Sequence, residues 1–142
     1  MRPTMKLIVA VFLGLVFSLI IFQVNSYARR GGFGTFDSFP GPQLVFPLTD
    51  DIALDGKNSL VFKWICRDAA RTDFYDFRLY KGYNMVESTL LMKKNVSGDT
   101  CSFEVSADLL EENQVYTWSL KRVFISGEKS DKSFSSFKII KK

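Results

Sequence analysis

The sequence of 142 residues predicts an all-β domain, a seven-stranded sandwich preceded by a hydrophobic N-terminal helix. From Pro42 onwards, short runs of alternating polar and apolar residues are separated by turn signals, which is typical of a sandwich or barrel. Aromatic residues make up 15% of the chain, and 14 residues are Phe, whose flat rings pack well on a pleated sheet. The segments before Pro42 are first apolar and then rich in Gly and Pro. We therefore expect one folded domain over residues 43–142.

The first 28 residues predict export across a membrane. Two basic residues, Arg2 and Lys6, precede a run over residues 7–22 that is apolar apart from one Gly and one Ser. A short polar stretch follows and ends with the small residues Ser26 and Ala28. These are the three parts of a secretory signal peptide, and cleavage would follow Ala28.

The length of the apolar run leaves a second interpretation open. A run of about 16–18 residues is long for a signal peptide and short for a membrane span. Arg29 and Arg30 come directly after the expected cut, where positive charge hinders translocation. Residues 1–28 are therefore either removed or kept as an anchor, in which case residues 7–24 make the contact with the membrane. Both interpretations place the domain outside the cytoplasm, in the periplasm, on the cell surface or in the medium.

Residues 29–42, with the sequence RRGGFGTFDSFPGP, form the expected linker. Four glycines and two prolines exclude a helix or a central strand. Phe33, Phe36 and Phe39 recur at every third position. We expect either a flexible spacer whose rings fold back onto the domain, or a tail that contacts a partner or adds to a sheet edge.

The strands of the domain are predicted from the alternation of apolar residues. The first, residues 43–54, contains Pro47, which lacks an N–H for the ladder and suits an edge. In the second, residues 59–66, Leu60, Phe62 and Trp64 share one face. The remaining expected strands cover residues 74–81, 89–94, 101–106, 115–125 and 133–140.

Three motifs in this order carry a resemblance to a known family. Trp64 lies in the second expected strand, and Tyr75 begins a Tyr-x-Phe-x-Leu pattern in the third. Leu110 lies before the sixth expected strand, six residues ahead of Tyr116. Over residues 42–140 the chain resembles a fibronectin type III domain, an immunoglobulin-like sandwich. The resemblance implies that the Tyr116 hydroxyl bonds back to the backbone and closes a corner between the sheets. The family's usual Pro after the Leu is absent, and without an Arg-Gly-Asp tripeptide no integrin binding is implied.

The resemblance also bears on the two cysteines. It makes the strand ending at Cys66 and the strand starting at Cys101 antiparallel neighbours. An even number of cysteines in an exported chain indicates a disulfide. The open alternative is a pair of buried free thiols.

Catalytic chemistry is not expected. The chain has no His, the commonest general acid–base residue and metal ligand. The pairs Asp50-Asp51 and Glu111-Glu112 fall in a turn and a loop, where we expect solvated surface rather than a glycosidase pair. Asp50, Asp51 and Asp55 lack the spacing of a calcium loop. We therefore expect no enzyme, no metal and no cofactor.

The expected partner is another protein. Beyond residue 28 the chain has 17 basic and 15 acidic residues, a balance that excludes a dedicated nucleic-acid binder. Phe74, Tyr80 and Tyr83 are predicted to face outward near Arg78, a combination typical of protein interfaces, although such rings also pair across a sheet. The sequence thus predicts a non-catalytic binding or structural module. The alternatives are a carbohydrate-binding or adhesion domain, with a glycan as ligand, and a non-catalytic subunit of an envelope enzyme. Asn95 opens a glycosylation sequon in an expected turn.

Overall fold

The computed structural model describes residues 38–140. The predicted signal peptide or anchor and the linker residues Phe33 and Phe36 lie outside this range, as does the predicted N-terminal helix. Between residues 38 and 140 the chain forms eight strands and three short 3-10 helices. No helix in that range is long and apolar enough to span a membrane.

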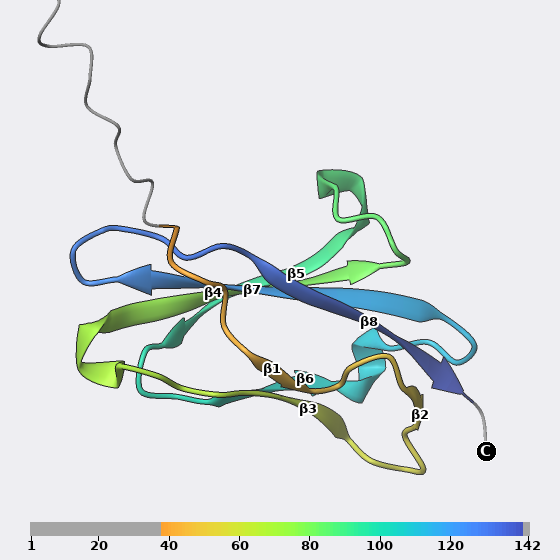
Figure 1. Cartoon of the computed structure of the whole chain (residues 1–142). Helices are drawn as coiled ribbons and strands as arrows, with labels where there is room; N and C mark the ends of the chain where they lie inside the picture. The colour runs from red at the N-terminus through yellow and green to blue at the C-terminus, as the bar shows by residue number, and fades with distance from the viewer. Residues whose placement is uncertain (1–37, 141–142) are drawn as a thin grey trace, which may run out of the picture. The chain divides into compact units, whose positions relative to one another are not determined.

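The strands form two sheets that face each other as two layers (Figure 1). The smaller sheet contains, in spatial order, β1 (Leu44–Phe46), β3 (Ser59–Trp64) and β6 (Ser102–Ser106). The larger sheet contains β2 (Asp51–Ala53), β8 (Ser133–Ile140), β7 (Val115–Phe124), β4 (Thr72–Lys81) and β5 (Leu90–Ser97). The 3-10 helices are η1 (Ala69–Arg71), η2 (Glu87–Thr89) and η3 (Ala107–Leu109). The prediction of an all-β domain is confirmed.

The first expected strand is two strands, which brings the number to eight. After β1 pairs with β3, the chain crosses to the other sheet, where β2 runs parallel to β8. Pro47 follows β1 directly, and a residue without an N–H cannot continue the ladder. Its side chain is buried, and its carbonyl oxygen accepts a hydrogen bond of 2.8 Å from Trp118 Nε1. The crossing segment is therefore fixed to the core from both sheets.

Strand β5 extends beyond the strand that was predicted over residues 89–94. It continues through Ser97, and the chain turns at Gly98 and Asp99. Val96 is buried opposite Tyr75, which extends the pairing of β4 and β5. The exposed Asn95 consequently lies in a strand, and the expectation of a turn at the sequon is wrong.

The core lies between the two sheets and is rich in aromatic rings. Leu60, Phe62 and Trp64 are buried, as the alternation of β3 predicts. The ring of Phe62 is fully buried and makes edge contacts with rings of the opposite sheet, at centroid distances of 5.1–5.7 Å: Phe77, Trp118 and Phe137. Each such ring pair contributes about 0.5–1.5 kcal/mol beyond the area that it buries.

The corner implied by the family resemblance is present. The backbone N–H of Glu111 donates a hydrogen bond of 2.7 Å to the Tyr116 hydroxyl. The ring of Tyr116 is fully buried and stacks on Phe137, and Leu110 is buried nearby in sequence. This bond ties the loop between η3 and β7 to the start of β7.

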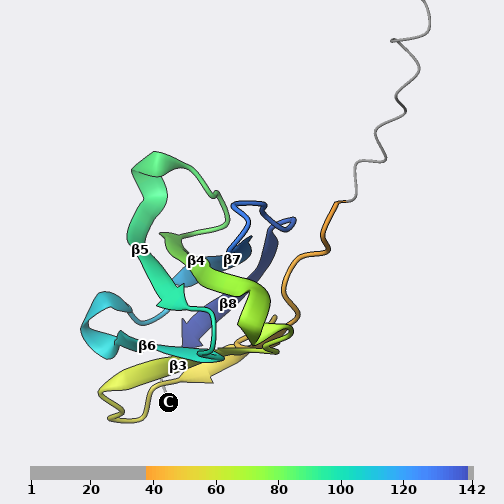
Figure 2. The same ribbon diagram turned by 90° about the vertical axis from the view of Figure 1, so that its left-hand side faces the viewer.

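Cys66 and Cys101 form a disulfide, as predicted. Cys66 follows β3 and Cys101 precedes β6, and Figure 2 shows these two strands side by side in one layer. Their Cα atoms lie 5.4 Å apart, and the Trp64 N–H donates to the Cys101 carbonyl at 3.1 Å. The bond closes a loop of 35 residues. The alternative of two free thiols does not apply.

Candidate functional site

The outer face of the five-stranded sheet presents the candidate site. Because Trp118 and Leu120 point into the core, Ser119 between them points outward. Its partners in the neighbouring strands are Arg78 in β4 and Phe134 in β8, and they share this face. Phe134 is 60% exposed, whereas the small Ser119 is almost fully shielded. An exposed ring and a guanidinium group therefore flank a small residue at the centre of the sheet.

Arg78 is held in place by Asp76 two residues earlier on the same face. Its Nη2 lies 2.8 Å from Asp76 Oδ2, and its Nε lies 3.2 Å from both carboxylate oxygens. The two side chains are 31% and 17% exposed. The bonds to Asp76 raise the pKa of Arg78, and the Tyr80 side chain acts in the same direction. The guanidinium is thus fixed in orientation and still accessible.

The structure separates the aromatic residues that were predicted to form a binding surface. Phe74 lies on the outer face and is half-buried, opposite Val123. Tyr80 also faces outward but is only 3% exposed, so the expectation of an exposed ring there is wrong. It lies on β4, between β7 and β5, and the connection over residues 82–89 rises above the five-stranded sheet on this side (Figure 1). Tyr83 is 72% exposed but belongs to that connection.

Phe134 was not singled out by the sequence reasoning. The signal for it is the alternation in β8, where Phe137 and Ile139 point into the core. Phe134 is an odd number of positions from both and must face the other way. Alternation thus identifies the face, while the exposed fraction depends on neighbours in other strands.

One linker ring docks on the domain. The ring of Phe39 lies 4.7 Å from that of Phe124. The Asp131 N–H donates a hydrogen bond of 2.7 Å to the Phe39 carbonyl. Phe39 also forms an isolated parallel β-bridge with Ser130. Its ring therefore folds back on the domain, as one interpretation expects, while its backbone pairs with a neighbouring segment, as the other expects.

The paired carboxylates occupy ordinary surface positions. Asp50 accepts a hydrogen bond of 3.0 Å from the Leu48 N–H. Glu111 pairs with Lys81 at 2.7 Å, and this contact raises the pKa of Lys81. In residues 38–140 no group of three or more His, Cys, Asp or Glu side chains is placed to hold a metal ion.

No protein-family model and no curated protein sequence matches this chain. Among solved structures, the crystal structure of a beta-1,2-glucanase from Parabacteroides distasonis is similar, with a TM-score of 0.45 and 13% sequence identity. The similarity covers 73% of this chain and 13% of the glucanase chain. This chain therefore spans a small part of that enzyme's length, and a likeness of this degree says nothing about activity.

Proposed function

We propose that this chain is a non-catalytic module that works outside the cytoplasm and binds another protein through the outer face of its five-stranded sheet. The observation that carries the proposal is the exposed ring of Phe134 on the same face as the fixed guanidinium of Arg78, on the other side of the small Ser119. Aromatic residues and Arg are enriched in protein interfaces. Burying an exposed Phe stabilises a complex by about 1.5–3 kcal/mol, and a guanidinium already held by Asp76 loses little freedom on binding.

We propose further that the domain is of the fibronectin type III kind. Support comes from the buried Trp64 and Tyr75 and from the bond between the Tyr116 hydroxyl and the Glu111 N–H. The parallel pairing of β2 with β8 adds an edge strand to the seven expected.

The proposed location depends on the disulfide and on the N-terminal sequence. Disulfides persist in oxidising compartments and are rare in the cytosol. Cys66 and Cys101 are bonded, and residues 1–28 have the composition of a signal peptide or anchor. Together these features support a domain delivered to the periplasm, the cell surface or the medium.

The proposal is tested by site-specific photo-crosslinking of the full chain in its own host. A photoreactive phenylalanine analogue replaces Phe134, and the control carries it at Glu104, an exposed position on β6 in the other sheet. We expect a discrete crosslinked protein from position 134 and none from position 104. Crosslinks from position 104 alone, or none from either position, would contradict the proposal.

A matched pair of alanine variants tests the chemistry of the contact. Phe134→Ala should weaken co-purification of the crosslinked partner. Ile125→Ala is the control and should leave co-purification unchanged, because Ile125 is an aliphatic residue, 69% exposed, in the turn after β7. If the full chain instead binds a glycan and Phe134→Ala abolishes that binding, the ligand of this face is a carbohydrate and the proposal of a protein partner is wrong.

A further inference from the structure

The three-stranded sheet has an open edge along part of β3. β1 pairs with β3 only at Trp64 and Lys63, whereas β3 has six residues. Figure 1 shows the chain leaving the end of β1 and turning toward the other layer on its way to β2. Within residues 38–140, the first part of β3, residues 59–62, therefore has no strand beside it on the β1 side.

The backbone of Val61 presents unpaired groups at this edge. The Trp64 N–H points toward β6, because it donates to the Cys101 carbonyl. The Ile65 N–H points the other way and donates to the Gln43 carbonyl, just before β1. Backbone groups alternate between the two sides along a strand, so the N–H and carbonyl of Val61 point to the β1 side. No strand of the described residues pairs with them there, which leaves a donor and an acceptor for an added strand.

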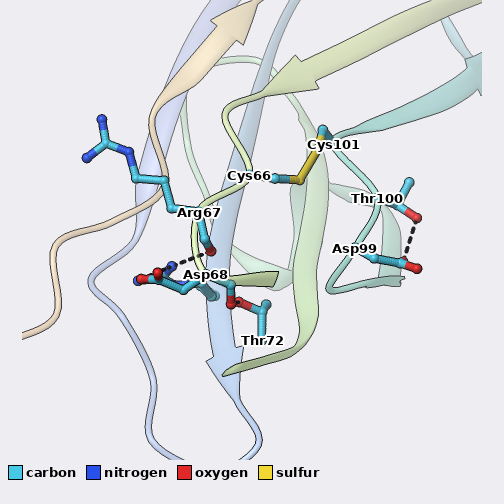
Figure 3. Close-up of a disulfide and its surroundings, with 8 residues drawn as sticks. Cys66, Arg67, Asp68, Thr72, Asp99, Thr100 and Cys101 are labelled. Atoms are coloured by element: carbon cyan, nitrogen blue, oxygen red, sulfur yellow. Dashed lines mark hydrogen bonds and ion pairs between the residues drawn. A yellow bond between two sulfur atoms is a disulfide. The ribbon is translucent and has the colours of Figure 1, made fainter. Parts of the chain in front are cut away.

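The other side of β3 is held in place. β3 pairs with β6 over residues 59–63. Figure 3 shows the disulfide that joins Cys66, after β3, to Cys101, before β6. The open edge is therefore preformed, and an added strand pays little for ordering it.

An apolar pocket of about 280 Å³ lies along this edge. Its apolar lining comes from the end of β1, from β2 and the residue after it, and from β3: Phe46, Ile52, Ala53, Leu54, Leu60 and Val61. The exposed Lys57 and Lys63 also line it, and no acidic residue of the described part of the chain does. The pocket therefore suits an apolar side chain that has negative charge beside it.

We propose that the open edge of β3 binds an extended segment of a partner protein in which apolar and acidic residues alternate. In strand addition, main-chain hydrogen bonds supply affinity, and pockets for alternate side chains supply specificity. The backbone of the segment pairs with Val61, and every second side chain enters the apolar pocket. The acidic side chains between them lie on the outer face of the sheet, to which the exposed Lys63 also belongs.

This edge is separate from the face on which the proposed function depends. It belongs to the three-stranded sheet, whereas Phe134 and Arg78 lie on the five-stranded sheet. Glu104, the crosslinking control, lies on β6 beyond β3 and does not line the pocket. Binding at the edge and binding at the outer face are therefore tested independently.

Hydrogen exchange of the full chain in detergent, followed by NMR, tests whether the edge is open. The Phe62 N–H points to β6 and is paired there, whereas the Val61 N–H points to the open side. After correction for intrinsic rates, we expect the Val61 amide to exchange at least about tenfold faster than the Phe62 amide. Equal, slow exchange at both amides would overturn the proposal.

Binding is tested by fluorescence anisotropy with labelled, capped hexapeptides in which Glu and Ile alternate. One methylated form carries N-methyl groups on its Glu residues and a second carries them on its Ile residues. The methyl groups face β3 in one form and away from it in the other, because amides alternate along a strand. We expect saturable binding of the parent peptide and a loss of at least about tenfold in only one methylated form. No binding of the parent, or equal affinity of the two methylated forms, would overturn the proposal.

Two charge variants separate the site from general attraction. Lys63→Glu and Lys93→Glu change the net charge equally at exposed lysines, but Lys93 lies on β5 of the other sheet and does not line the pocket. Lys63→Glu should weaken binding of the Glu–Ile peptide about fivefold and strengthen binding of a Lys–Ile peptide. Lys93→Glu should leave both affinities unchanged. Equal changes in the two variants would overturn the proposal.

Discussion

Tyr116→Phe is the sharpest test of the corner between the two sheets. The substitution keeps the fully buried ring and its stacking on Phe137 and removes the hydroxyl that accepts from the Glu111 N–H at 2.7 Å. An internal hydrogen bond contributes about 0.5–1.5 kcal/mol net, and a buried donor left unpaired costs about 1–3 kcal/mol. Glu111 is an exposed residue, so water reaches its N–H in part and the lower end applies. We expect a loss of about 1–2 kcal/mol in the free energy of unfolding.

The loss is measured by urea unfolding at equilibrium, followed by tryptophan fluorescence. A domain of this size changes its midpoint temperature by about 4–8 °C for each kcal/mol, so thermal unfolding gives a second readout. Tyr83→Phe is the matched control, because Tyr83 is 72% exposed. If Tyr116→Phe and Tyr83→Phe both stay within about 0.3 kcal/mol of the wild type, the corner bond contributes nothing and the reasoning is refuted.

Three further predictions concern the disulfide, a close packing contact and a buried hydroxyl. The double variant Cys66→Ser, Cys101→Ser should lose about 3–4 kcal/mol in urea unfolding by loop entropy, and a loss below about 1 kcal/mol would contradict this estimate. Gly98→Ala should lose about 1–3 kcal/mol, because its Cβ would lie 2.6 Å from the carbonyl carbon of Thr72; wild-type stability would show that β4 and β5 can separate there. Burial raises the pKa of Tyr75 above 10.0, so its contribution to the free energy of unfolding is fully present below that pH and is lost as the pH rises further. Tyr75→Phe should therefore reduce the loss of stability at alkaline pH, measured by urea unfolding. Equal losses in the variant and the wild type would exclude Tyr75 as the source.

The sequence is most informative where a side chain's environment depends on its own strand. Alternation placed Leu60, Phe62 and Trp64 correctly in the core, because neighbouring residues of a strand point to opposite faces. The same rule put Tyr80 on the outer face but could not show that it is buried. That burial depends on neighbouring segments, which the period of one strand does not reveal.

Features that depend on two distant segments were harder to predict. Pro47 indicated a break in the first expected strand. That β2 pairs with the edge of β8 could not be predicted, because it depends on where the strands of the other sheet lie. The corner at Tyr116 could be predicted only because the family resemblance implies a bond from its hydroxyl to the backbone.

The central claim is that this chain carries a disulfide-bonded domain to the far side of a membrane. It is tested most directly by intact-mass analysis of the endogenous protein, with thiols trapped by an alkylating agent at the moment of lysis. The account predicts no alkylated cysteine before reduction and two after it, on a chain that begins at Met1 or at Arg29. Two alkylated cysteines without reduction would contradict an oxidising location and with it the proposed export.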